Sequence, residues 1–142
     1  MYFGSFAHNL DDKGRLMIPR KMREELGYKV YIMKGFDGSL SIYTEANYQK
    51  LVEEFNKLPF SQQRNRDYLR LQFASTYEMD VDKLGRVQIP TALLNKFNIS
   101  REVLVLGIGD HIEIWDQKKY EEYESSIKDE FENIAESIGN ND

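Results

Sequence analysis

The chain has 142 residues, a length that suits one domain or two small ones with a hydrophobic core of real size. It contains no cysteine, which excludes disulfides and thiolate metal sites, and no apolar run approaches the length of a membrane-spanning helix. The first ten residues also lack the basic and then apolar pattern of a signal peptide. We therefore expect a soluble, cytoplasmic protein with no membrane partner.

The net charge of −5 is distributed unevenly along the sequence. From Asp116 to Asp142 there are nine acidic residues and three lysines, so the acidity belongs to this C-terminal segment. The preceding residues include sixteen basic and fifteen acidic ones, with basic clusters at 13–23 and 64–70. Charge separated in this way allows a positive face to meet a polyanion such as nucleic acid, although the whole chain is acidic.

The start of the chain predicts two strands separated by a tight loop. Residues 1–10 alternate weakly between apolar and polar positions, which is typical of a short strand. In the loop that follows, Asp11 is placed to bond backbone amides, and Gly14 supplies a positive φ at low cost. A strand resumes at Arg15 and ends at Pro19, because proline cannot donate to a β-ladder.

A short helix and a hairpin are expected next. The helix covers residues 20–26 and ends at Gly27, a residue able to take a left-handed conformation. Strands 30–33 and 40–43 form the hairpin, with the aliphatic residues of the second strand buried and Ser41 outside. The same pattern in the second hairpin of the chain places Glu113 outside.

Two helices complete the first half of the chain. Thr44 is expected to cap an amphipathic helix that stops at Pro59, and Ser61 to cap a connecting helix after it. Three arginines project from the polar sides of the connecting helix: Arg64, Arg66 and Arg70. Two roles are open for these arginines. They either contact DNA alongside the loop of the second half, or they contact an acidic neighbour in another subunit.

The segment 9–19 (NLDDKGRLMIP) returns 71 residues later as 80–90 (DVDKLGRVQIP). Five positions are identical in the two copies: Asp11 and Asp82, Gly14 and Gly85, Arg15 and Arg86, Ile18 and Ile89, Pro19 and Pro90. The elements expected after the second copy also repeat those of the first: a helix over 91–97 ended by Asn98, a hairpin of 103–106 and 112–115, and a helix with Asp116 as its N-cap. The chain is a duplicated unit.

The last helix carries a regular apolar stripe. Its members recur every three or four residues: Tyr120, Tyr123, Ile127, Phe131, Ile134 and Ile138. The stripe packs either onto the body of the same chain or between subunits, where aromatic residues are favoured. Residues 139–142 are expected to be frayed.

The arginine at the end of each loop points to ligand binding. A turn needs its Asp and its Gly, but nothing in a turn requires arginine at both Arg15 and Arg86. The planar guanidinium pairs bidentately with phosphate or with the O6/N7 edge of guanine, and Asp11 or Asp82 could hold it in position. The alternative is an internal Asp–Arg salt bridge that only fastens the loop.

A basic cluster distinguishes the two halves. Arg20-Lys21-Met22-Arg23 has no counterpart in the second half, where Thr91-Ala92-Leu93-Leu94 stands in its place. We therefore expect the two halves to contribute unequally to recognition of the ligand. These cations lie either on a solvated helix face or against phosphates.

Signals for catalysis are weak. His8 and His111 lie in separate strands, which makes a poor metal site in a chain without cysteine. The segment Gly107-Ile108-Gly109 lacks the third glycine of a dinucleotide loop and is better explained as a hairpin turn. We expect no enzymatic activity, no catalytic residue, no metal, no cofactor and no small-molecule substrate.

The two copies of D-x-x-G-R, each followed by hydrophobic-x-Ile-Pro, resemble the MraZ family of bacterial transcriptional regulators, and each half is similar to the AbrB-like swapped-hairpin DNA-binding module. The resemblance implies a mixed β/α, β-rich fold: two pseudo-symmetric swapped-hairpin β-barrel repeats with short helices and a C-terminal amphipathic helix. It also implies closed homo-oligomeric rings. Such rings would bind double-stranded DNA at short direct repeats in the promoter of the regulator's own cell-division and cell-wall gene cluster, which implies association with the nucleoid.

The resemblance also assigns residues. The family's Asp and Arg pair falls on Asp11 with Arg15 and on Asp82 with Arg86, with Gly14 and Gly85 shaping the loops, and the arginines are expected at base edges. From charge and position we add phosphate contacts by four residues: Lys13, Arg20, Lys21 and Lys83. Leu84 stands where the first loop has Lys13, which predicts a less basic second loop.

The sequence predicts four segments: a first repeat over 5–47, a helical connector over 48–75, a second repeat over 76–119 and an acidic amphipathic helix over 120–142. Two other functions remain open. One is an antitoxin-like protein-interaction module that uses the acidic tail. The other is a purely structural ring.

Overall fold

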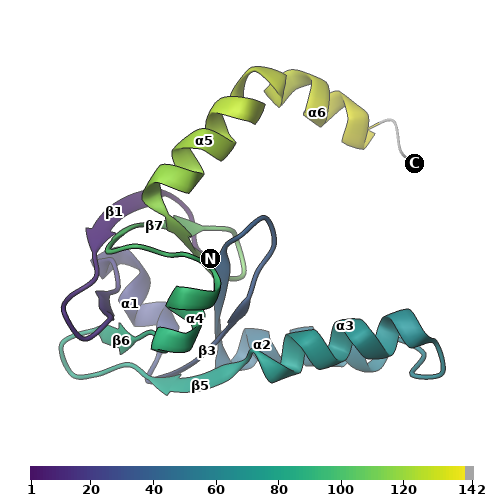
Figure 1. Cartoon of the computed structure of the whole chain (residues 1–142), viewed down its shortest axis with the longest axis horizontal. Coiled ribbons are helices and arrows are strands. Elements are labelled where there is room, and N and C mark those ends of the chain that lie inside the picture. The colour runs from purple at the N-terminus through teal and green to yellow at the C-terminus, as the bar shows by residue number, and fades with distance from the viewer. Residues whose placement is uncertain (140–142) are drawn as a thin grey trace.

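The structure is a computed structural model that describes residues 1–139 (Figure 1). The strands are β1 (Ser5–Asn9), β2 (Arg15–Met17), β3 (Lys29–Lys34), β4 (Leu40–Thr44), β5 (Tyr77–Asp80), β6 (Arg86–Gln88), β7 (Glu102–Gly107) and β8 (Ile112–Asp116). The helices are α1 (Arg20–Leu26), α2 (Glu45–Asn56), α3 (Gln63–Ala74), α4 (Thr91–Lys96), α5 (Gln117–Ile127), the 3₁₀ turn η1 (Lys128–Glu130) and α6 (Phe131–Gly139). The fraying expected over 139–142 falls, apart from Gly139 at the end of α6, outside the described residues.

The main sheet joins the two halves of the chain by exchanging their first strands. Its antiparallel order is β1-β7-β8-β4-β3-β5. Strand β1 of the first half pairs with β7 of the second, and β5 of the second half pairs with β3 of the first. Each half therefore completes the hairpin of the other, and the β-rich, mixed fold of two swapped repeats is confirmed.

Strands β2 and β6 form a separate two-stranded ribbon, the meeting point of the two repeated motifs. Leu16 pairs with Val87 at its centre, and both side chains are fully buried. Beyond the strands, the amide of Ile18 donates to the carbonyl of Gly85, and the amide of Ile89 donates to the carbonyl of Gly14, each at 3.0 Å. The end of each motif is thus bonded to the loop of the other.

One core lies between the sheet, the ribbon and the short helices, and both halves contribute to it. The aliphatic residues predicted to be buried in the outgoing hairpin strands are all fully buried: Leu40, Ile42, Ile112 and Ile114. Met22 and Leu26 of α1 and Leu93 of α4 close the same core. Since neither half encloses its own apolar residues, the halves depend on each other for hydrophobic stabilisation.

The prediction that Ser41 lies outside is wrong. Ser41 is only 6% exposed, because α2 and α3 cover the second face of the sheet there. A small cluster of Met33, Tyr43 and Phe55 fills this layer. Glu113 is also only partly exposed, and its Oε1 accepts a hydrogen bond from the indole Nε1 of Trp115 at 3.0 Å.

Two of the three helix N-caps predicted from the local sequence are present in the structure. Thr44 accepts from the amide of Asn47 at 3.1 Å and Asp116 from the amide of Lys119 at 3.3 Å, so both predicted N-caps are confirmed. The prediction for Ser61 is wrong, because the backbone stays extended at Gln62 and α3 begins one residue later without a side-chain cap. At the helix ends, two residues adopt the positive φ expected of them: Gly27 and Asn98.

The C-terminal segment is bent rather than one continuous helix. Helix α5 ends at Ile127, the turn η1 follows, and α6 starts at Phe131. Just before the bend, the hydroxyl of Ser126 donates to the carbonyl of Tyr123 at 2.6 Å, a contact that competes with the helical hydrogen-bond pattern and bends helices. The segment leaves the body after its first turns, as Figure 1 shows in yellow-green. Among residues 1–139, no helix has the length and hydropathy to cross a membrane.

Candidate nucleic-acid interface

The first loop, residues 11–15, is built around the carboxylate of Asp11. Its Oδ1 accepts from the amides of Lys13 and Arg15, each at 2.9 Å. The backbone closes the loop by a bond from the amide of Gly14 to the carbonyl of Asp11 at 3.0 Å, with Gly14 at φ +75°. Only glycine takes this φ without strain, so the Asp and the Gly have the roles that the sequence predicted for them.

The second loop, residues 82–86, repeats this geometry. Asp82 Oδ1 accepts from the amides of Leu84 and Arg86 at 2.9 Å each, and Gly85 has φ +84°. The remaining oxygen, Oδ2, accepts from the Nε of Arg86 at 2.8 Å, as Oδ2 of Asp11 accepts from the Nε of Arg15 at 2.5 Å. Two segments 71 residues apart thus present an arginine in the same way.

The salt bridge considered as an alternative is present in both loops, and it leaves the guanidinium groups able to bind a ligand. Each Asp engages only the Nε edge, and the hydrogen bonds of residues 1–139 do not use the Nη atoms of Arg15 or Arg86. The side chains are 29% and 25% exposed. A guanidinium held along one edge with its outer fork free is prepared for bidentate contact.

The electrostatics keep the pairs ionised. The amide of Arg15 and then its guanidinium lower the pKa of Asp11 to about 2. The amide and guanidinium of Arg86 lower the pKa of Asp82 in the same way. Both carboxylates are therefore charged at neutral pH, so each arginine stays fixed to its loop.

The ribbon places the two arginines on one face. Arg15 pairs with Gln88 and Arg86 with Met17, so all four side chains point away from the buried Leu16 and Val87. Arg15 and Arg86 are diagonal neighbours, about 7–8 Å apart in such ladders. The outer face of the ribbon is hence a short surface with one oriented arginine from each half.

Arg23 is a functional candidate that was not assigned from the sequence. A methyl group added at Gly85 would lie 2.7 Å from its Cδ and Nε, so this side chain packs directly on the second loop. The Nε also donates to the carbonyl of Ile18 at 2.8 Å. In the other half, Leu94 occupies the equivalent place against Gly14, at 3.4 Å.

The signal for Arg23 was present in the aligned repeats, where it faces Leu94 in an otherwise matched pattern. The sequence alone did not show that α1 of the first half packs against the loop of the second half.

The other predicted cations are arranged less uniformly. Lys13 and Lys83 are exposed in the first and second loops, and Arg20 is exposed at the start of α1, directly after the ribbon strand β2. Lys21 lies instead beside Met1 and other residues of the N-terminus, around a separate hollow. The structure therefore groups the loop lysines with the arginines and leaves Lys21 apart.

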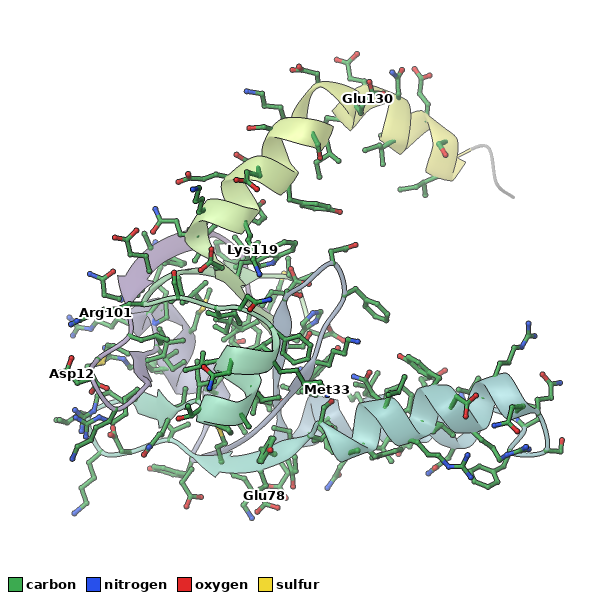
Figure 2. The ribbon with its side chains drawn as sticks, in the orientation of Figure 1. Asp12, Met33, Glu78, Arg101, Lys119 and Glu130 are labelled. Atoms are coloured by element: carbon green, nitrogen blue, oxygen red, sulfur yellow. The ribbon has the colours of Figure 1, made fainter. Side chains whose placement is uncertain are left out.

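The expectation that the second loop is less basic is reversed. In the first loop, Asp12 is an extra acid, and it pairs with Arg101 at 3.5 Å; both are labelled in Figure 2. The second loop has Lys83 at the position of Asp12, and Arg23 lies against it. The second loop thus carries more positive charge than the first.

Within residues 1–139, no group of three or more His, Cys, Asp or Glu side chains could hold a metal ion. The guanidinium groups of the two loops are hydrogen-bond donors that can pair with an anion.

A chain whose two halves exchange strands and interlock their loops belongs to the class of duplicated swapped-hairpin proteins. The family described as "MraZ protein, putative antitoxin-like" matches residues 1–71 and again residues 72–140. The transcriptional regulator MraZ of Mesoplasma florum is 45% identical over 139 residues, which cover 97% of this chain and 95% of that protein.

Two further relatives agree. The transcriptional regulator MraZ of Mycoplasmoides gallisepticum is 37% identical over 138 residues, covering 97% of each chain. That of Syntrophomonas wolfei is 36% identical over 138 residues, covering 97% of this chain and 96% of that protein. The chain belongs to the MraZ family, whose members named here are transcriptional regulators.

Proposed function

We propose that the protein is a sequence-specific, non-enzymatic DNA-binding regulator of transcription that reads double-stranded DNA with the two loops. The observation that carries this proposal is the paired geometry of Arg15 and Arg86. Each is fixed through Nε by its own Asp, and both lie on the outer face of one ribbon with the Nη atoms free. Such forks match the O6/N7 edge of guanine.

The surrounding cations would supply affinity rather than sequence information. Lys13, Lys83, Arg20 and Arg23 lie at or beside the loops and are placed to meet phosphates, which adds salt-dependent binding. Lys21 stays a weaker candidate, because it lies with the N-terminal residues. In this arrangement phosphate contacts fix the position of the ribbon, and the arginines read the bases.

A single copy presents a small basic surface, so we propose that several copies act together as a closed homo-oligomeric ring. Several ribbons would then bind several tandem repeats in the promoter of the regulator's own cell-division and cell-wall gene cluster, at the nucleoid. Each further contact is effectively intramolecular, which raises the total affinity without new chemistry. The spacing of the repeats becomes part of the specificity.

The second candidate is a protein-interaction module that acts through the C-terminal segment. It is favoured by the exposed apolar residues of α6, such as Phe131 at 77% exposure. Co-purification of a stoichiometric partner of a different sequence would support it.

The deciding experiment compares DNA binding by the wild type, Arg15→Ala and Arg86→Ala. The DNAs are the chain's own upstream region and scrambled DNA of equal length, at two salt concentrations. We expect a strong preference for the upstream DNA, which each substitution reduces by about 1–3 kcal/mol, the value of one bidentate base contact. Equal, weak binding of both DNAs by all three proteins would reduce the arginines to a structural role in their loops.

A further inference from the structure

Leu84 is a large apolar residue at the tip of the second loop, and the fold leaves its side chain exposed. Its exposed fraction is 60%, whereas Val87 of the same motif is fully buried. The backbone amide of Leu84 donates to Oδ1 of Asp82 at 2.9 Å, but its side chain belongs to neither hydrophobic cluster of residues 1–139. The loop therefore uses the backbone of Leu84 and leaves the side chain available for a ligand.

The shape of the loop does not require leucine at this position. In the first loop Lys13 stands at the equivalent place, and its amide donates to Oδ1 of Asp11 at the same distance, 2.9 Å. Two loops with one backbone geometry thus carry different tips, an ammonium group and a branched aliphatic group. Because the geometry accepts both, the residue at the tip can determine what each loop recognises.

The residues beside the two loops differ in the same sense. The carbonyl of Arg101 accepts from the amide of Leu10 at 2.8 Å just before the first loop. The carbonyl of Tyr28 accepts from the amide of Val81 at 2.8 Å just before the second loop. Arg101 is a cation, whereas Tyr28 is an aromatic residue with an exposed fraction of 88%. The second loop is therefore the one with apolar surface at its tip and at its flank.

Leu84 lies between residues that the proposed function places on DNA. Lys83 precedes it, and Arg86 follows it by two residues. The amide of Gly85 donates to the carbonyl of Asp82 at 3.0 Å, which closes the loop and keeps these residues together. Figure 1 shows the loop next to β6, at the end of the molecule where the ribbon lies. A duplex that meets Arg86 therefore also meets Leu84.

The major groove offers one feature that suits an apolar tip. All four bases present hydrogen-bonding groups there, but only thymine presents a methyl group, at C5. The leucine side chain has no donor or acceptor, so contact with a polar base edge would remove water from that edge without replacing its hydrogen bond. Contact with the thymine methyl group removes apolar surface of both partners from water, which is favourable.

We propose that Leu84 is a specificity-determining residue that contacts the C5 methyl group of a thymine in the major groove. This inference rests on the proposed DNA-binding function and adds a second base to the one recognised by Arg86. Residues two apart in the chain span at most about 7 Å, and successive base pairs are about 3.4 Å apart. The thymine therefore lies within about two base pairs of the guanine that Arg86 recognises. The first loop, with Lys13 at its tip, lacks this contact.

The test compares two DNAs that differ only in methyl groups. One is the chain's own upstream region, and the other is the same duplex with every thymine replaced by uracil. This replacement keeps each hydrogen-bonding group and removes each C5 methyl group. Affinity is measured by fluorescence anisotropy for the full-length wild type, Leu84→Ala and the control Ile108→Ala, with scrambled thymine DNA as a reference. Ile108 is an exposed aliphatic residue between β7 and β8, outside both loops.

We expect the wild type and Ile108→Ala to bind the uracil DNA at least about fourfold more weakly than the thymine DNA, the loss that corresponds to burial of one methyl group. Leu84→Ala shortens the side chain to its Cβ, so it should bind both DNAs with equal affinity. Leu84→Lys gives the second loop the tip of the first. It should also bind both DNAs equally, and its binding should depend more steeply on salt.

Two results would overturn the inference and leave the proposed function intact. In the first, the wild type prefers the upstream DNA to scrambled DNA but binds its thymine and uracil forms equally. In the second, Leu84→Ala stays as sensitive to uracil as the wild type. A wild type without preference for the upstream DNA would instead contradict the proposed function, and the inference with it. Circular dichroism checks folding, and if Leu84→Ala does not fold, Leu84→Lys decides by the same comparison.

Discussion

Arg23 of the first half lies directly against Gly85 of the second, with its Cδ and Nε 2.7 Å from where a methyl group on that glycine would be. The equivalent pair in the other half of the molecule is Leu94 with Gly14, at 3.4 Å. The two loops thus have the same internal geometry but different neighbours. This difference permits matched tests of what each loop contributes.

Gly85→Ala and Gly14→Ala form the first such test. Both positions have φ near +80°, where a Cβ costs about 1–2 kcal/mol, so we expect both substitutions to destabilise the fold by that amount. Gly85→Ala must in addition displace Arg23, so it should weaken DNA binding more than Gly14→Ala does. Urea unfolding and a DNA titration of both variants check this. Equal losses of DNA affinity would show that Arg23 plays no part.

Arg23→Gln tests the charge at the second loop. The substitution removes one cation placed to meet a phosphate, so the slope of log K against log salt should fall by about 1 without a change in sequence preference. Lys50→Gln, an exposed change on α2, is the control and should leave the slope unchanged. If Arg23→Gln leaves the slope unchanged, Arg23 does not contact a phosphate.

The Asp–Arg pairs predict a specific acid sensitivity. The pKa of Asp11 is about 2 in the folded protein, below the value of about 3.9 expected when unfolded. Such a carboxylate stabilises the fold above pH 4, and this contribution is lost as the pH falls from about 4 towards 2. The free energy of unfolding of the wild type, compared with its value at pH 5, should therefore drop as the pH falls from about 4 to about 2. The double variant Asp11→Asn with Asp82→Asn should be less stable at pH 5 and show a smaller drop.

The buried hydroxyl of Tyr2 leads us to expect a stabilising substitution at this position. Its side chain is buried, and its hydroxyl has no hydrogen-bond partner among the described residues. Burial accordingly raises the pKa of Tyr2 to about 12. Tyr2→Phe removes an unsatisfied polar group and should stabilise the fold by about 1 kcal/mol. Tyr28→Phe, at 88% exposure, should be neutral. A clear loss of stability in Tyr2→Phe would mean that the hydroxyl does have a partner in solution.

The features that the sequence predicted correctly are those that local chemistry determines. Asp11 and Gly14 shape a loop from within five residues, Thr44 and Asp116 cap helices that begin at the next residue, and strand alternation predicts the burial of Ile42. The pairing of the two halves was predicted from the resemblance to the MraZ family, which implies swapped hairpins; the duplication alone predicts two similar units.

The features that could not be predicted depend on partners distant in the sequence. Ser41 follows the alternation rule for an exposed residue, but α2 and α3 cover its face of the sheet. Arg23 looks like one of several helix cations until β2 is seen to pair with β6 and Ile18 to bond Gly85, which places α1 beside the second loop. The bend at Ser126 lies within a stripe whose apolar spacing is continuous, so periodicity alone does not reveal it.

Under the proposed function, the covalent link between the halves would have a consequence for the direction in which DNA is read. Two identical chains that exchange hairpins share a two-fold axis and are matched to a palindrome. Here Arg23 stands opposite Leu94 and Asp12 opposite Lys83, so the molecule has no such axis and its two ends are chemically distinct. A DNA-binding protein of this kind would bind its site in one orientation. It would distinguish a site from its reverse complement, and successive copies would bind in the same orientation along a strand.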